Sequence, residues 1–178
     1  MQKYLILDRD GVINYDSKYF IKSPDEWEAI PGSLEAMADL NKAGYKIVIA
    51  TNQSAIARGI FLQETLDSIH QKMIDELAKF GGNILDIFYC PHHPDDGCEC
   101  RKPRPGMLLD FAKKYNADLS NICMVGDRTK DILAAKAAGA MPHFVKTNYS
   151  AEFNDEILKD VMMHENLAEF ATWLIKQP

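Results

Sequence analysis

Short apolar runs alternate along this chain with longer stretches in which apolar residues recur every three or four positions. The longer stretches predict helices from Ser33 to Ala43, ahead of Gly44, and from Leu62 to Phe80, with further helices starting near Gly106 and Thr129. This alternation is typical of an α/β fold with a mainly parallel sheet, right-handed crossovers and helices on both faces. The runs predict strands at 3–8, 45–50, 84–90, 121–126 and 142–146.

Length and composition limit the number of domains. The 178 residues, 47% of them apolar, suffice for the core of one ordinary domain and not of two, so one domain over residues 1–178 is expected. We interpret residues 150–178 as a helical tail that packs on this domain, with helices at 151–160 and 165–176.

Charge and hydropathy restrict the expected cellular location and the expected binding partners. No apolar stretch reaches the length of a membrane span and no signal-peptide pattern is present, so a cytoplasmic protein without a membrane partner is expected. The net charge of −6 argues against nucleic acid as a partner, because such surfaces are basic. The absence of an apolar excess favours a monomer.

Candidate chemistry begins at the end of the first predicted strand. Asp8 and Asp10 follow the apolar run 4–7, and Gly11 allows a sharp turn directly after them. Because strand side chains alternate, the two carboxylates leave the strand on the same side. Crowded carboxylates favour a hard divalent cation such as Mg²⁺, often shared with a substrate phosphate. The alternative interpretation is a simple turn, since Asp and Gly are common turn formers.

Three further segments make an ordered set with the first. Thr51-Asn52 follows the second predicted strand, Lys102 lies in a later loop, and Gly126-Asp127 with Asp131 follows the fourth strand. This combination resembles the four motifs of the haloacid dehalogenase-like hydrolase superfamily over about the first 145 residues. The resemblance implies a Rossmann-like domain that transfers phosphoryl groups. The spacing between motifs leaves no room for a separate cap domain, so the loops at 15–31 and 90–105 must cover the substrate.

The resemblance implies a role for each motif residue. Asp8 is expected to attack phosphorus as the nucleophile, and Asp10 to protonate the leaving oxygen and later accept a proton from water. Mg²⁺ would be held by Asp8, Asp127 and the backbone carbonyl of Asp10. Asp131 is expected to support this site.

Two further groups are expected to meet the phosphate. Thr51 and the backbone of Asn52 would donate hydrogen bonds to the transferring phosphoryl oxygens, and Lys102 would supply a positive charge. The alternative for Thr51 and Asn52 is a turn-forming pair without a catalytic role.

A cysteine-rich loop carries a second chemical signal. Cys90, His92, Cys98 and Cys100 lie within eleven residues and supply four ligands suited to a tetrahedral, structural Zn²⁺ site. The alternatives are free thiols or a disulfide, and the cytoplasmic setting disfavours the latter. His93 is the less favoured histidine ligand, because Cys-x-His spacing selects His92.

The zinc loop and the missing cap narrow the resemblance to a branch acting on heptose 1,7-bisphosphate or on histidinol phosphate. The segments 22–27 and 57–59 look more like the sugar bisphosphate phosphatases, whereas Val12 and Ala55 depart from the usual pattern. The branch therefore implies a small anionic sugar phosphate as substrate. The expected substrate contacts are Asp16, Ser17, Lys18, Tyr19, Asn52, Gln53, Ser54, Arg101 and Arg128.

Rival functions remain at this stage. Histidinol-phosphate phosphatase is the alternative within the branch, and a non-catalytic, zinc-stabilised interaction module is the alternative outside enzymes. A polynucleotide 3′-phosphatase would need a basic groove that the acidic composition does not indicate. The remaining histidines, His70, His143 and His164, are interpreted as surface or packing residues.

Overall fold

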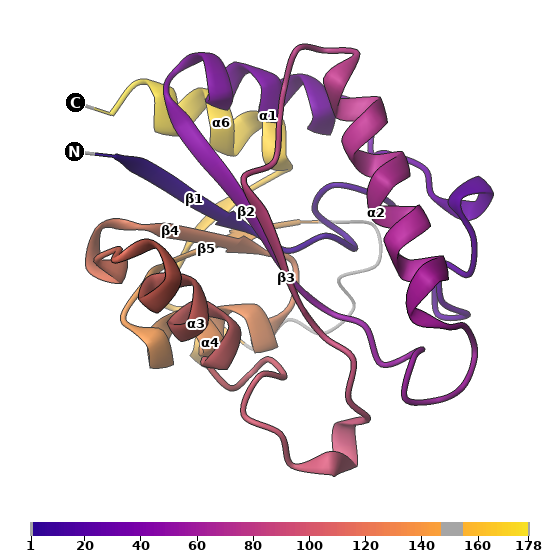
Figure 1. Ribbon diagram of the computed structural model, residues 1–178. Coiled ribbons are helices and arrows are strands. Elements are labelled where there is room, and N and C mark those ends of the chain that lie inside the picture. The colour runs from indigo at the N-terminus through magenta and orange to yellow at the C-terminus, as the bar shows by residue number, and fades with distance from the viewer. Residues whose placement is uncertain (1, 147–154, 178) are drawn as a thin grey trace.

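Six parallel strands form one sheet in the order β3-β2-β1-β4-β5-β6. The computed structural model describes residues 2–146 and 155–177 (Figure 1). The five predicted strands are confirmed, with ends that differ by up to two residues. The strands are β1 (Lys3–Leu7), β2 (Tyr45–Asn52), β3 (Asp86–Cys90), β4 (Cys123–Gly126), β5 (Met141–Val145) and β6 (Met162–His164).

Helices cover both faces of the sheet, as Figure 1 shows. Alternation along β1 explains why: Leu5 and Leu7 join the core under α1, α2 and α6, whereas Ile6 joins the core under α3 and α4. Both layers are apolar, which accounts for the near-continuous hydrophobic strands. The helices are α1 (Ser33–Lys42), α2 (Gln63–Ala78), α3 (Gly106–Tyr115), α4 (Thr129–Ala138), α5 (Asp155–Leu158) and α6 (Leu167–Ile175). Short 3₁₀ turns occur at Pro24–Glu26, Pro94–Asp96 and Leu119–Asn121.

The tail departs from the all-helical prediction. Met162–His164 forms β6, which pairs in parallel with β5 and extends the sheet. Three residues are too few to display a period of two, so the sequence pattern did not reveal this strand. Of the helix predicted at 151–160, residues 151–154 lie outside the described part, and α5 occupies Asp155–Leu158. The last predicted helix is confirmed as α6.

The absence of a cap is confirmed along the described chain. Between Asp10 and Thr51 lie one short 3₁₀ turn, α1 and β2, and between Ser54 and Lys102 lie α2, β3 and the cysteine-rich loop. None of the helices among residues 2–146 and 155–177 is long and apolar enough to cross a membrane. The order of the strands reverses between β1 and β4, so their carboxyl ends frame the position where ligands bind in open α/β sheets.

Candidate active site

Three buried carboxylates meet where β1 and β4 end. Asp8 follows β1, Asp127 follows β4, and Asp131 comes from the first turn of α4, with an oxygen of each within 4.8 Å of the others. Burial, reinforced by the charge of Asp131, raises the pKa of Asp8 to about 6, although Lys102 opposes the rise. Burial and the charges of Asp8 and Asp131 raise the pKa of Asp127 to about 8.

This cluster fits a hard divalent cation. Its donors are carboxylate oxygens, which Mg²⁺ prefers, and their mutual repulsion is what a bound cation would relieve. Gly11 is required beside it, because its φ of +84° is left-handed and a Cβ there would overlap the Asp127 carboxylate. The side chain of Asp10 is not a member of the cluster, whereas that of Asp131 is.

Lys102 lies inside the cluster, with a side chain that is fully shielded from solvent. Its Nζ is 2.9 Å from Asp8 Oδ1 and 2.7 Å from Asp131 Oδ1, and it donates to the Ala50 carbonyl at 2.7 Å. Although burial alone would lower it, these two carboxylates hold the pKa of Lys102 above its usual value. The lysine therefore stays charged and partly balances the buried acids.

Asn52 fixes the backbone that carries Lys102. The Asn52 side chain donates to the Lys102 carbonyl at 3.1 Å and accepts from the Lys102 amide, also at 3.1 Å. The end of β2 is thereby joined to a loop fifty residues further along the chain.

Asp10 points to a different set of partners. Arg9 contacts both of its carboxylate oxygens, and Asn14 and Gln53 each donate at 2.9 Å. Burial would raise the pKa of Asp10, but the charge of Arg9 and these hydrogen bonds outweigh burial and hold the pKa below its usual value. Gln53 also donates to Thr51 Oγ1 at 3.0 Å, which links Asp10 to the end of β2.

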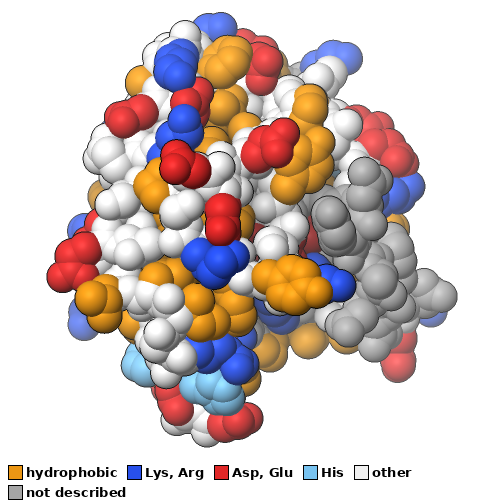
Figure 2. Space-filling model, turned by 90° about the vertical axis from the view of Figure 1, so that its right-hand side faces the viewer, with side chains coloured by type: hydrophobic (Ala, Val, Ile, Leu, Met, Phe, Trp, Pro, Cys, Tyr) orange, Lys and Arg blue, Asp and Glu red, His pale blue; other side chains and the backbone are white. Residues whose placement is uncertain are grey.

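A polar cleft of about 180 Å³ opens over these groups. Figure 2 views this side of the molecule, where blue Lys and Arg side chains lie near the pale-blue histidines at the lower edge. Most of the expected substrate contacts line this cleft, together with Lys130 and Phe20, which the motifs did not single out. The expected contacts found there are Asp16, Ser17, Asn52, Gln53, Ser54, Arg101 and Arg128.

Lys18 and Tyr19 are not among the residues that line the cleft. Tyr19 is 68% exposed, and Lys18 Nζ lies over its ring, 5.0 Å from the centroid. The turn from Ser17 to Phe20 explains this outward position, since the Phe20 amide donates to Ser17 and closes the turn. Arg128 instead reaches inward, 2.8 Å from Asp16 and 3.4 Å from Asp127.

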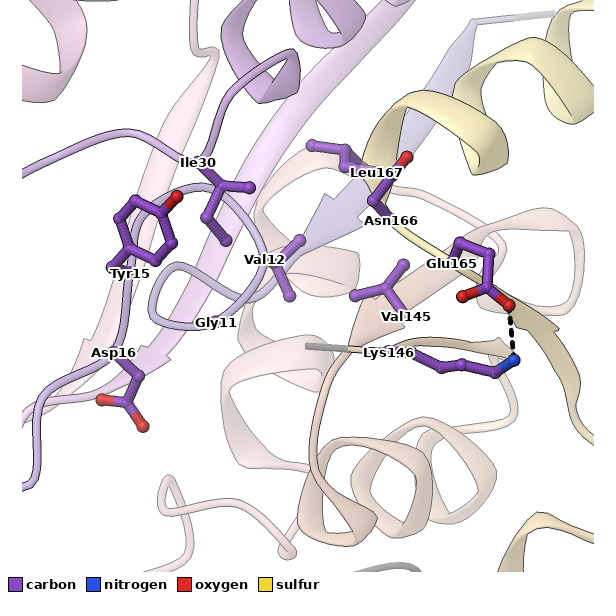
Figure 3. A pocket seen from close by; sticks show the side chains of 10 residues that line it. All are labelled: Gly11, Val12, Tyr15, Asp16, Ile30, Val145, Lys146, Glu165, Asn166 and Leu167. Atoms are coloured by element: carbon purple, nitrogen blue, oxygen red, sulfur yellow. Dashed lines mark hydrogen bonds and ion pairs between the residues drawn. The ribbon is translucent and has the colours of Figure 1, made fainter. Parts of the chain in front are cut away.

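A second hollow lies behind the loop that follows β1 (Figure 3). Its walls are largely apolar, with Val12 and Leu167 among them, and a Lys146–Glu165 ion pair lies at one end with Asp16 at the other. It holds none of the clustered acids, so the chemistry belongs to the polar cleft.

The cysteine-rich loop brings four potential zinc ligands together. The contact distances are 3.6 Å for Cys90 with Cys98, Cys98 with Cys100 and Cys90 with His92 Nδ1, and 3.2 Å for His92 Nδ1 with Cys100. Ligands about 2.0 to 2.3 Å from a tetrahedral centre lie roughly 3.3 to 3.8 Å apart, so the donor set fits Zn²⁺.

The alternatives for this loop fare less well. Its sulfur atoms are too far apart for a disulfide, which needs about 2.05 Å. His93 serves elsewhere, as its Nδ1 accepts from the Asp95 amide at 3.4 Å and caps the following 3₁₀ turn. Arg101 donates to the His92 carbonyl at 3.4 Å, so the loop is tied to one wall of the cleft.

This arrangement is typical of hydrolases that transfer phosphoryl groups. It combines an aspartate at the end of a strand with a buried lysine and two further acids. The chain belongs to the haloacid dehalogenase-like hydrolase family, whose sequence profile matches residues 2–139.

Particular relatives narrow the comparison further. The chain is 55% identical over 145 residues to D-glycero-beta-D-manno-heptose-1,7-bisphosphate 7-phosphatase of Bordetella bronchiseptica, covering 82% of this chain and 81% of that one. It is 47% identical over 174 residues to the enzyme of that name from Pseudomonas putida, covering 97% and 99%. The crystal structure of D,D-heptose 1,7-bisphosphate phosphatase from B. bronchiseptica, complexed with magnesium and phosphate, has a TM-score of 0.92 at 47% identity and 99% coverage of both chains.

Proposed function

We propose that this protein is a phosphatase that removes the 7-phosphate of D-glycero-D-manno-heptose 1,7-bisphosphate. The observation that carries the proposal is the buried Asp8–Lys102–Asp131 contact beside Asp127, in a chain whose full-length relatives bear that activity in their names. Buried charged groups beside an open polar cleft are typical of catalytic sites, and a non-catalytic module does not require them.

The reaction follows from the placement of two carboxylates. Asp8 attacks phosphorus, the phosphorus–oxygen bond to the sugar breaks, and an aspartyl-phosphate forms. Asp10 gives a proton to the departing sugar oxygen. Water then attacks the aspartyl-phosphate, Asp10 takes its proton, and phosphate leaves. Thr51 and the Asn52 amide are proposed to donate to phosphoryl oxygens, while Lys102 offsets their negative charge.

Mg²⁺ is proposed as the catalytic cofactor. Asp8, Asp127 and the backbone carbonyl of Asp10 would hold it, and the buried position of Asp131 makes it a further support. When bound, the ion supplies positive charge that offsets repulsion between nucleophile and phosphate.

Zn²⁺ is proposed as a structural ion in the cysteine-rich loop. Cys90, His92, Cys98 and Cys100 fill a tetrahedron, so no open position remains to activate water. The contact of Arg101 with the His92 carbonyl is consistent with a zinc loop that positions Arg101 and Lys102.

Recognition of the second phosphate is assigned to the basic wall of the cleft. Arg101 is the leading residue, because a planar guanidinium binds a phosphate through two parallel hydrogen bonds. Arg128 is already paired with Asp16, so it is proposed to contact the sugar side of the substrate. Roles for Lys18 and Tyr19 in binding stay predictions.

A substrate panel tests this proposal. Phosphate release is measured with heptose 1,7-bisphosphate, histidinol phosphate and a 3′-phosphorylated oligonucleotide, each with added Mg²⁺. We expect far higher kcat/KM on the heptose bisphosphate, with the 7-phosphate released. Comparable efficiency on histidinol phosphate would favour the alternative within the branch.

The nucleophile is tested by Asp8→Asn. This variant keeps the size of the side chain and most hydrogen bonds, so we expect a folded protein without turnover. Near-normal phosphate release by Asp8→Asn would exclude the aspartyl-phosphate, and activity in metal-stripped buffer would exclude the catalytic cation.

A further inference from the structure

Phe20 has an unusual backbone conformation for so large a residue. Its φ is +64°, and among the described residues the other non-glycine residue with a positive φ is Asn116. Asn116 ends α3, a position where the left-handed conformation is common and asparagine tolerates it. Phe20 lies instead in the loop between β1 and α1, where its Cβ makes this conformation unfavourable. Residues in such conformations persist only where their surroundings hold them, and they gather at sites that bind ligands.

The contacts of the loop hold this conformation in place. The Phe20 amide donates to the Ser17 carbonyl at 3.0 Å, and the Phe20 carbonyl accepts from Lys22 Nζ at 3.3 Å. Lys22 Nζ is in turn 2.8 Å from Glu26. The next residue, Ile21, is 5% exposed and belongs to the core under α1, α2 and α6. The chain is therefore anchored on both sides of Phe20.

This turn separates the environments of two neighbouring aromatic rings. Tyr19 is 68% exposed and does not line the cleft, whereas Phe20 is half-buried and does. Phe20 packs against an apolar cluster that includes Phe61 and Leu66, at the start of α2. The packing makes Phe20 a fixed part of the wall of the cleft.

Phe20 also supplies an apolar surface to a cleft that is otherwise polar. The described residues that line the cleft carry polar or charged side chains, with the exception of Phe20 and Ile21. Ile21 is largely committed to the core, so the ring of Phe20 is the main apolar surface left for a ligand. The guanidinium carbon of Arg58 lies 5.9 Å from the centroid of this ring, so a positive charge borders it.

The carbon skeleton of a sugar phosphate matches such a wall. The C–H bonds on one face of a pyranose ring carry partial positive charge, and the face of an aromatic ring is the negative part of its quadrupole. The hydroxyl groups of the sugar lie at the rim of the pyranose and remain free for the polar side chains of the cleft. A bare phosphate beside Asp8 gains nothing from an aromatic wall, so the ring serves the part of the ligand beyond the phosphate.

We propose that Phe20 is a specificity-determining residue whose ring receives the C–H face of the sugar while the 7-phosphate is presented to Asp8. This inference rests on the proposed function, because it concerns the sugar part of that substrate. The strained backbone is then the means by which a short loop turns an aromatic side chain into the cleft.

The variant Phe20→Leu tests the proposal, because leucine keeps an apolar side chain but has no flat face. The ring contacts the sugar in the ground state and in the transition state alike, so its loss should raise KM and leave kcat nearly unchanged. We expect kcat/KM on heptose 1,7-bisphosphate, measured with Mg²⁺, to fall by roughly 3- to 10-fold, as for the loss of one aromatic contact.

Inhibition by inorganic phosphate separates the sugar contact from damage to the phosphate position. Inorganic phosphate competes for the place of the transferred group without a sugar, so its inhibition constant should stay within about twofold of wild type in Phe20→Leu. Phe20→Tyr keeps the flat ring and should restore KM. Phe20→Gly removes the ring and tolerates the left-handed backbone, so it provides the same test if Phe20→Leu does not fold.

Phe80→Leu is the matched control. Phe80 follows the end of α2, is 42% exposed and does not line the cleft, so this variant should keep wild-type KM and phosphate inhibition. Tyr19→Leu distinguishes the two neighbouring rings: a rise in KM found in Tyr19→Leu and not in Phe20→Leu would overturn the assignment to Phe20.

Failure of the proposed function and failure of this inference give different results. A wild-type protein that releases no phosphate from heptose 1,7-bisphosphate overturns the proposed function. An active wild type whose Phe20→Leu and Phe20→Gly variants keep their KM overturns the role of Phe20. The same holds if these variants weaken inhibition by inorganic phosphate as much as they raise KM, because the loop would then support the phosphate position and not the sugar.

Discussion

Replacement of Lys102 by methionine tests whether the buried acids depend on this one cation. Methionine preserves most of the aliphatic volume but removes a charge lying 2.9 Å from Asp8 and 2.7 Å from Asp131. Removing one partner of a buried ion pair typically costs roughly 3 to 5 kcal/mol, because the other charge is left without compensation. Here two carboxylates are left without this partner, so we expect a loss of about 4 kcal/mol, in the middle of that range.

The loss should be visible in both heat and urea unfolding. For a chain of this size, about 4 kcal/mol corresponds to a fall in Tm of roughly 8 to 16 °C. The measurement is made at pH 7 without added divalent metal, so that a cation cannot replace the lysine charge. Activity measured with Mg²⁺ should fall by about 10² to 10³ fold, as for loss of one preorganised electrostatic contact.

Lys114→Met is the matched control. Lys114 also lies 2.7 Å from an aspartate, Asp86, but its side chain is 58% exposed. An exposed pair contributes less than about 1 kcal/mol. If Lys102→Met and Lys114→Met are equally stable, the buried lysine does not balance the acid cluster and the electrostatic reasoning is refuted.

Two further predictions concern the zinc loop and the buried histidines of β5 and β6, His143 and His164. Cys98→Ala should lose stoichiometric zinc by elemental analysis and lower kcat/KM while the domain stays folded, whereas Cys123→Ala, altered within the apolar core, should retain zinc. Burial lowers the pKa of His143 to about 4, and its Nδ1 lies 3.2 Å from Nε2 of His164. Between about pH 6.5 and pH 4, this histidine therefore binds a proton in the unfolded chain but not in the folded one. Stability should therefore fall as pH drops from about 6.5 toward 4, and this histidine should account for about 2 kcal/mol of the loss at pH 5. Urea unfolding of His143→Phe should show a correspondingly flatter dependence, and an unchanged slope would contradict this assignment.

The fold was largely predictable because its central strands, β1, β2 and β4, are mostly buried on both faces. Such strands appear in the sequence as apolar runs, and two of the helices between them carry clear stop signals at Gly44 and Gly139. The three residues of β6 carried no such signal, since their place in the sheet is decided by pairing with β5.

The sequence indicated which residues gather in the candidate site better than it indicated which of their side chains are in contact. Sequence order indicated that Asp8, Lys102 and Asp127 would converge, because parallel strands end at one edge of a sheet. It did not reveal that Lys102 would be fully buried between acids, nor that Arg9 would fold back onto Asp10. Both depend on side-chain length and on neighbours distant in sequence, which periodicity does not encode. The outward position of Lys18 and Tyr19 depends on a local turn at Ser17.

The pairing of Asn52 with the peptide of Lys102 bears on how the protein acquires its activity during folding. The acid cluster joins the connection that follows β1 to the connection between β4 and α4, and the two ends of this amide contact are separated by fifty residues. Contacts of such long range form only after the entropy of closing the intervening chain has been overcome. The cleft therefore exists only once the sheet from β2 to β4 is complete. We therefore expect a chain that lacks these strands to be inactive, so that enzymatic activity reports completion of this part of the sheet.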